Sequence, residues 1–163
     1  MGRPRLYLAT ALAFLVEWGV LTHVSLLGVH PRLLPALVYL VGVSAGADRG
    51  AECGLFAGAL CYLTGGTPWQ MALFTLLGGI SGAVFHKMEG FWGKWLLCLP
   101  ALAGWEGLQL LGHCLGGVSL AAGLRVAGAE LLLAVVCFPG AALLLLWQPR
   151  PRRRGRVRRL RGR

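Results

Sequence analysis

The stretch VAGAELLLAVVCFPGAALLLLW, residues 126–147, decides the fold class, because it holds only one charged residue, Glu130, in a long apolar run. A helix needs roughly 20 such residues to cross a hydrocarbon core about 30 Å thick. Turns rich in Gly, Pro or charged residues separate this run from five more apolar segments. These segments are 6–27, 33–47, 53–64, 69–85 and 95–115. The sequence therefore predicts an all-α integral membrane protein, a bundle of about six transmembrane helices.

The composition supports lipid rather than water as the surrounding solvent. Hydrophobic residues make up 56% of the 163 residues, and charged residues only 13%, about half the usual share. A soluble domain of this size needs a charged shell, which this chain lacks. The segments at 33–47 and 53–64 are short for a bilayer, so a five-helix or re-entrant arrangement of residues 33–64 remains an alternative.

Basic residues are concentrated at the end of the chain. The net charge is +10, and nine of the sixteen Lys and Arg residues lie in 150–163. A segment so rich in Arg, Pro and Gly cannot bury enough apolar surface to fold alone. We therefore divide the chain into a polytopic transmembrane domain, 1–148, and a basic tail, 149–163, predicted to be disordered. With the N-terminus inside, six crossings put most basic residues and both termini in the cytoplasm, as the positive-inside rule requires.

The basic tail is expected to contact anionic lipid headgroups at the inner leaflet, an attraction worth about 1 kcal/mol per residue near the surface. The candidate contacts are Arg152, Arg153, Arg154 and Arg156. A role as a topology anchor only is the alternative. Nucleic acid is not an expected partner, because no aromatic residues are interleaved to stack on bases.

Glycines recur at four-residue spacing on the predicted helices. The candidate face for helix packing or for a partner comprises Gly54, Gly58, Gly78 and Gly82. Four residues are about one helical turn, so each pair leaves a bare groove that lets another backbone approach closely. The groove predicts a tightly packed bundle, a docking face for another membrane protein, or both.

Ionisable groups inside a membrane are costly and are therefore candidates for function. The candidate intramembrane polar cluster comprises Glu17, Glu106, Gln109 and His113. The last three share one helix face, since they are three and four residues apart. No Lys or Arg is expected within the spans to pair with the carboxylates. We expect a hydrogen-bonded cluster that fixes helix packing, with a ligand or proton site as the alternative.

Signatures of catalysis are missing from the sequence. There is no GxSxG elbow, HExxH helix or phosphate loop, so no enzymatic activity is expected. The 5 cysteines form no CxxC pair, which favours small apolar fillers over metal ligands, and no cofactor is expected. Asp48, Arg49 and Glu52 are expected to form a solvated turn in a short inner loop.

The region from His30 to Lys87 carries a pattern of motifs. They read Pro31-Arg32-Leu33-Leu34, Asp48-Arg49-Gly50, Gly54-Leu55-Phe56-Ala57-Gly58, Gly65-Gly66-Thr67-Pro68 and Leu77-Gly78-Gly79-Ile80-Ser81-Gly82. This pattern resembles the core of the rod shape-determining protein MreD family. The family has an Asp near the end of its third helix, where this chain has Cys61 and Tyr62, so no role of that acid is carried over.

The resemblance implies a non-catalytic scaffold of the cell-elongation machinery in the bacterial inner membrane. Its implied partners are an MreC-like protein and, through the complex, MreB and the peptidoglycan synthases. The alternative is the substrate-binding S component of an energy-coupling-factor vitamin transporter, which resembles the same fold. That class often docks its coupling subunit through an Ala-x-x-x-Ala face, and Ala9 and Ala13 have this spacing. An outward cavity with convergent polar groups would favour transport, and an exposed small-residue face would favour scaffolding.

Overall fold

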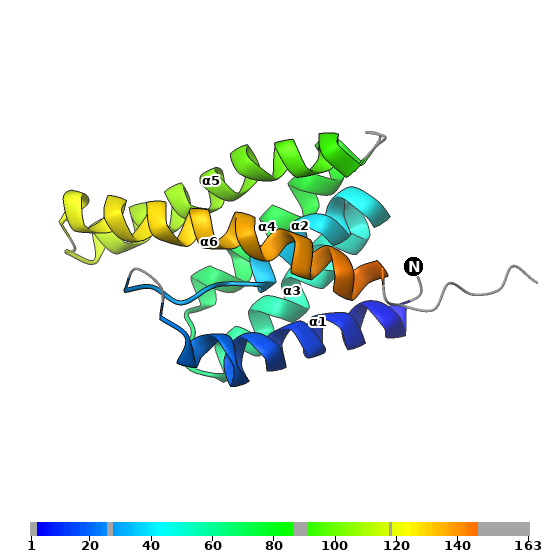
Figure 1. Cartoon of the computed structure of the whole chain (residues 1–163), viewed down its shortest axis with the longest axis horizontal. Coiled ribbons are helices and arrows are strands. Elements are labelled where there is room, and N and C mark those ends of the chain that lie inside the picture. The colour runs from blue at the N-terminus through cyan, green and yellow to red at the C-terminus, as the bar shows by residue number, and fades with distance from the viewer. Residues whose placement is uncertain (1–2, 26–27, 87–90, 118, 147–163) are drawn as a thin grey trace, which may run out of the picture.

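The computed structural model describes residues 3–25, 28–86, 91–117 and 119–146, and they form an all-helical fold (Figure 1). The helices are α1 (Arg3–Gly19), the 3-10 helix η1 (Leu21–His23), α2 (Leu34–Ala45), α3 (Ala47–Leu63), α4 (Pro68–Phe85), α5 (Phe91–Leu115) and α6 (Leu120–Leu146). The start of α1 and the end of α6 lie at the same end of the molecule (Figure 1). The tail at 149–163, with its predicted lipid contacts, lies outside the described residues.

Three of these segments are long and apolar enough to cross a membrane: Arg3–His23, Pro68–Phe85 and Leu120–Ala142. Large apolar side chains point outward from them, such as Leu15 at 62% exposed and Val136 at 72%. This arrangement is stable in lipid, where an apolar exterior carries no penalty. The chain thus has the all-helical fold and the apolar spans of a membrane protein, and the number of crossings belongs to the proposal below.

Helix α2 lies at the centre of the bundle and contacts each of the other five α-helices. All residues from Leu34 to Val43 are buried, because the helix is apolar on every side, as a fully enclosed helix must be. Its 12 residues reach only about 18 Å at 1.5 Å per residue. The helix at the second predicted span thus lies in the core of the bundle and is shorter than a hydrocarbon core about 30 Å thick.

A sharp corner joins α2 to α3. Gly46 adopts a φ of +94° at this corner, a conformation that glycine reaches without steric cost. Helix α3 then begins at Ala47, six residues earlier than the predicted segment. The expected solvated turn at Asp48, Arg49 and Glu52 is wrong: these residues belong to the start of α3. Ala47 restarts the helix at once, and Asp48 is favourable there because a helix N-terminus attracts negative charge.

The most extensive helix contact in the described structure is between α3 and α4. The predicted glycines form this contact. A Cβ atom added to Gly54 would lie 2.0 Å from the Phe74 carbonyl oxygen, and one added to Gly78 would lie 2.0 Å from the Gly50 carbonyl oxygen. Gly58 and Gly82 meet α4 and α3 backbone in the same way. This face is covered within the chain, so it is not open to a partner.

Candidate functional site

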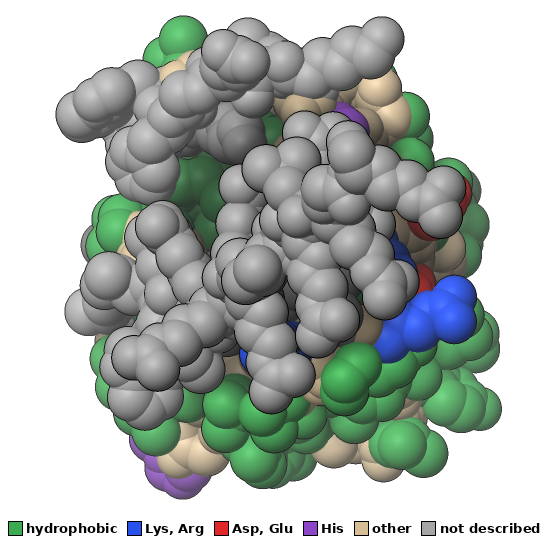
Figure 2. All heavy atoms as spheres, turned by 90° about the vertical axis from the view of Figure 1, so that its right-hand side faces the viewer, with side chains coloured by type: hydrophobic (Ala, Val, Ile, Leu, Met, Phe, Trp, Pro, Cys, Tyr) green, Lys and Arg blue, Asp and Glu red, His purple; other side chains and the backbone are tan. Residues whose placement is uncertain are grey.

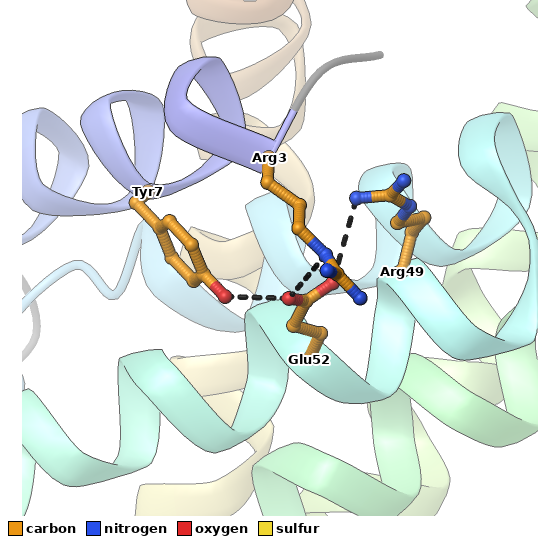
Figure 3. Close-up of polar contacts among 4 residues, drawn as sticks. All are labelled: Arg3, Tyr7, Arg49 and Glu52. Carbon is orange, nitrogen blue, oxygen red and sulfur yellow. Dashed lines mark hydrogen bonds and ion pairs between the residues drawn. The ribbon is translucent and has the colours of Figure 1, made fainter.

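Two groups of charged side chains lie at opposite ends of the bundle. The first lies at the end that holds the start of α1, and Figure 2 looks onto this end, where blue and red side chains lie at one side of a mostly hydrophobic described surface. Glu52 is its centre (Figure 3). The Tyr7 hydroxyl donates to Glu52 Oε1 at 2.5 Å. Arg3 Nε lies 3.2 Å from Glu52 Oε1, and Arg49 Nη1 lies 3.6 Å from Oε2.

This first group joins α1 to α3 and holds Glu52 in its charged form. The hydrogen bond from Tyr7 lowers the pKa of Glu52, and the nearby Arg3 and Arg49 guanidinium groups lower it further, while partial burial opposes them. Arg3 is 71% exposed, so its ion pair is screened by solvent and weak. The geometry is that of a structural tie between the two helices.

The second group is built on the junction between α1 and α2. Glu17 Oε2 accepts hydrogen bonds from the backbone N–H groups of both Leu33 and Leu34, each at 2.7 Å. A helix N-terminus leaves such N–H groups without intrahelical acceptors and carries a partial positive charge. Glu17 therefore caps α2 from a distant part of the chain, and its negative charge is compensated by the helix end.

An arginine joins this second group. Arg32 Nη2 lies 3.1 Å from Glu130 Oε1, with the two side chains 31% and 13% exposed. The expectation covered only Lys and Arg within the spans, and this pair shows that a basic residue outside them reaches a carboxylate within one. Arg32 lies in the segment before α2, and its side chain reaches Glu130 on α6. The signal that was available is Glu130 itself, because a carboxylate in a span requires a partner.

The remaining predicted residues lie on α5 and face the same region. Glu106 is 4% exposed and Gln109 is 7% exposed, whereas His113, one turn further, is exposed. All three line a cavity of about 240 Å³ between α5 and α6, which Glu130 also lines. The structure thus brings Glu106, Gln109 and His113 together and places Glu17 on the opposite side of Gln109.

A larger polar cavity of about 330 Å³ lies on that opposite side, and we refer to it as the polar cavity. Its hydrogen-bonding side chains include Glu17, Thr22, Arg32, Thr64, Gln70 and Gln109, and its aromatic ones are Phe14, Trp18 and Phe74. Gln109 therefore separates the two cavities. Its side-chain nitrogen Nε2 is buried and has no hydrogen-bond partner among the described residues, which is costly for a buried donor.

A third hollow is apolar and lies between α4 and α5. This α4–α5 groove has a volume of about 460 Å³ and is lined by residues such as Leu76, Ile80, Ala101, Gly104 and Trp105. The contact between α4 and α5 is much smaller than that between α3 and α4. A Cβ atom at Gly104 would meet nothing within 4 Å. Trp105 Nε1 is buried and finds no acceptor in the described part of the chain.

The cysteines and other metal-ligating residues form no further centre in the described ranges. All 5 cysteines are free thiols, and Cys53 and Cys98 are buried among apolar side chains, as expected for small core residues. Within residues 3–25, 28–86, 91–117 and 119–146, no group of three or more His, Cys, Asp or Glu side chains is arranged to hold a metal ion.

These features define a class, an all-helical membrane protein with a buried polar cluster and two kinds of hollow. No protein-family model, curated protein or solved structure matches this chain. Any assignment of function therefore rests on the geometry and on the resemblance in the sequence.

Proposed function

We propose that this chain is a non-catalytic, MreD-like scaffold of the bacterial cell-elongation machinery, a multi-pass protein of the inner membrane with both termini in the cytoplasm. The α4–α5 groove would receive a transmembrane helix of a partner, an MreC-like protein, and through it the peptidoglycan synthases. The observation that supports this proposal most directly is the open apolar groove. In it, Gly104 leaves bare backbone next to exposed large apolar side chains such as Leu76 and Ile80.

The groove has the features that favour helix association in lipid. Small residues, here Ala101 and Gly104, allow two backbones to approach closely. The indole N–H of Trp105 lacks an acceptor among the described residues, and a carbonyl or hydroxyl on a docked helix would supply one. Lipid tails can fill the groove but cannot accept that hydrogen bond.

The transporter alternative is less well supported by α1. Its coupling face would require Ala9 and Ala13 on the surface, but these residues are only 4% and 0% exposed. Ala13 belongs to the hydrophobic core cluster, and Ala9 is buried as well. The predicted docking spacing therefore serves internal packing in this chain, although a cavity with convergent polar groups, which would favour ligand binding, is present.

The proposal is tested by filling the groove. The tagged full-length protein is purified from native membranes, and the copurifying membrane proteins are identified. Gly104→Leu should abolish recovery of the elongation-complex partner, because the new side chain occupies the space between α4 and α5. Gly128→Leu on α6 is the matched control, since Gly128 also has nothing within 4 Å of its Cβ position and lines none of the three hollows.

The outcomes separate the alternatives. Recovery of an MreC-like protein with the wild type and with Gly128→Leu, but not with Gly104→Leu, supports the scaffold. Recovery of a pair of ATPase subunits would contradict it and favour the transporter. Equal recovery of the MreC-like partner with both variants would place the docking surface elsewhere and refute the role of the groove.

A further inference from the structure

We infer that the polar cavity is a binding site for a small zwitterion with an apolar or aromatic side chain, of the chemical class of a free amino acid. This inference goes beyond the proposed scaffold, because it assigns a small-molecule site on a face that the α4–α5 groove does not include. It rests on Gln109, Arg32 and Glu17, which reach the cavity from α5, from the segment before α2 and from α1.

The side-chain nitrogen of Gln109 requires a hydrogen-bond acceptor, which a ligand in the cavity would supply. This side chain is more than nine-tenths buried, lines the cavity, and leaves its Nε2 without a partner among the described residues. Arg32 lines the same cavity and uses Nη2 for Glu130. A guanidinium carries five N–H donors in a planar fork, so others remain for a ligand. A carboxylate offers acceptor atoms for both side chains.

The carboxylate of Glu17 can accept a hydrogen bond from a donor group on the ligand. Its Oε2 accepts the two N–H groups of α2, and a carboxylate has further lone pairs on its second oxygen. An ammonium group in the cavity would find an acceptor there. Phe14, Trp18 and Phe74 supply apolar contact for the remainder of the ligand.

The charge balance selects a ligand with no net charge. Arg32 is already neutralised by Glu130, and Glu17 by the N-terminus of α2. A ligand with a single charge would bring an uncompensated charge into a partly buried site, which is costly. A zwitterion adds one group of each sign, and each meets its complement.

The size and position of the cavity are compatible with this class. A volume of about 330 Å³ lies at the lower end of the range for small-molecule sites. The exposed residues Thr22, His30 and Thr64 form its rim, at the end of the bundle where α1 finishes (Figure 1). In the proposed orientation this end faces away from the cytoplasm.

The test compares ligands that differ only in charge. The full-length protein in detergent is titrated with phenylalanine, with phenethylamine, which lacks the carboxylate, and with hydrocinnamate, which lacks the amine. Leucine is included as an aliphatic amino acid. Thermal unfolding reports binding, because a ligand that binds only the folded state raises the Tm. Phenylalanine or leucine should raise the Tm, and the two singly charged analogues should raise it much less.

Variants connect the binding to the cavity. Gln109→Met keeps a similar volume but removes the donor, so it should weaken amino-acid binding by about tenfold. Trp105→Phe is the matched control: it removes another buried N–H that lacks an acceptor among the described residues, one turn away on α5, but Trp105 lines the α4–α5 groove instead. It should leave ligand binding unchanged, because a phenyl ring at this position retains the contact with Phe74, whose ring centroid lies 4.4 Å from that of Trp105. Arg32→Lys, which keeps the charge opposite Glu130, serves as a second variant and should also weaken binding.

Three results would overturn the inference. One is that neither amino acid raises the Tm of the wild type. Another is that phenethylamine or hydrocinnamate raises it as much as phenylalanine, which would indicate a simple charge site. The last is that Gln109→Met and Arg32→Lys bind the amino acid as tightly as Trp105→Phe does. Failure to copurify an elongation partner would leave these measurements unaffected, so the two proposals fail independently.

Discussion

Glu17 performs for α2 the task that a local cap performs for most helices. The residue before this helix, Leu33, provides no side-chain cap, and Leu33 and Leu34 are both buried. A carboxylate from α1 supplies the acceptor instead. The intramembrane acid therefore has a structural role that is sufficient to explain its presence in a span.

Substitution of Glu17 should reveal this role as a graded loss of stability. Glu17→Gln retains a carbonyl oxygen that can accept the same N–H groups, whereas Glu17→Ala leaves them unpaired. We expect Glu17→Ala to destabilise by about 1–3 kcal/mol and Glu17→Gln by clearly less, measured by thermal unfolding in detergent. Equal loss for both variants would show that the charge, rather than the acceptor, is what stabilises α2.

The ionisation of Glu52 makes the stability of the fold depend on pH. Its pKa is lowered in the folded protein from a reference value of 4.5, first by the Tyr7 hydrogen bond. A group whose pKa is lowered by folding stabilises the fold above its unfolded pKa, and this contribution is lost as the pH falls through the folded pKa. The wild type should therefore lose stability below about pH 4.5.

Tyr7→Phe is the variant that tests this dependence, because it keeps the edge-on ring contact with Phe56 at 5.0 Å and removes only the hydroxyl. We expect it to unfold at a lower temperature than the wild type at neutral pH. The difference in unfolding temperature between the wild type and Tyr7→Phe should become smaller as the pH falls below about 4.5, where Glu52 becomes protonated in the unfolded state. If this difference in unfolding temperature stays constant across the pH range, the Tyr7–Glu52 hydrogen bond is not its cause.

At the scale of elements, the α3–α4 contact depends on the absence of side chains. Gly54→Ala and Gly78→Ala each place a methyl group about 2.0 Å from a backbone carbonyl oxygen, so the helices must separate. We expect a loss of about 1–3 kcal/mol for each. Gly128→Ala on α6 meets nothing within 4 Å and should be neutral or slightly stabilising, because Ala is the better helix former. Thermal unfolding in detergent compares the three.

The positions of most helices could be predicted from the sequence. Apolar runs and Gly or Pro breaks locate α4 within one residue at its start, since Thr67 and Pro68 mark it, and Gln70 Oε1 accepts the Thr67 N–H at 3.3 Å. The four-residue glycine spacing correctly indicated close packing, but the pattern contains no information on which helix fills the groove. The start of α3 was misplaced because charged residues in a helix end resemble those of a turn.

The candidate site could be predicted only in part from the sequence. Helical spacing predicts that Glu106 and Gln109 share a face, and both are buried. The pairs that complete the site, Arg32 with Glu130 and Glu17 with the start of α2, join residues on different helices or loops. Such contacts are set by tertiary packing, which a periodicity within one helix does not report. The same reason explains why Ala9 and Ala13 faced the core rather than a partner.

At the scale of the whole molecule, the distribution of charge predicts the topology. Arg3 and Arg49 lie together at one end, and Arg32 lies at the α1–α2 junction on the other. The positive-inside rule, applied with the basic tail, predicts that the first end faces the cytoplasm. Tags at the N- and C-termini should both be digested by protease in inside-out vesicles and both be protected in right-side-out ones. Tags on opposite sides would require an odd number of crossings.

The tail at 149–163 is expected to lie on anionic lipid. Replacing Arg152, Arg153, Arg154 and Arg156 with Gln should release it, because each basic residue near the surface contributes about 1 kcal/mol. Fluorescence of a label at the C-terminus, in nanodiscs with and without phosphatidylserine, measures this contact. The wild type should respond to the anionic lipid and the variant much less. If the wild type and the variant respond equally to the anionic lipid, the tail acts only as a topology anchor.

The enclosure of α2 has a consequence for biogenesis. A segment of 12 residues, about 18 Å long, cannot match the hydrophobic thickness of the bilayer, and it has no side that is meant for lipid. When the ribosome delivers it, this hydrophobic mismatch persists until later-synthesised partners enclose it. The largest contacts of α2 are with α4 and α3, which follow it directly in the chain, and α6 adds a smaller one. Residues 34–45 should therefore become enclosed in steps, and the enclosure is complete only after α6 has been inserted.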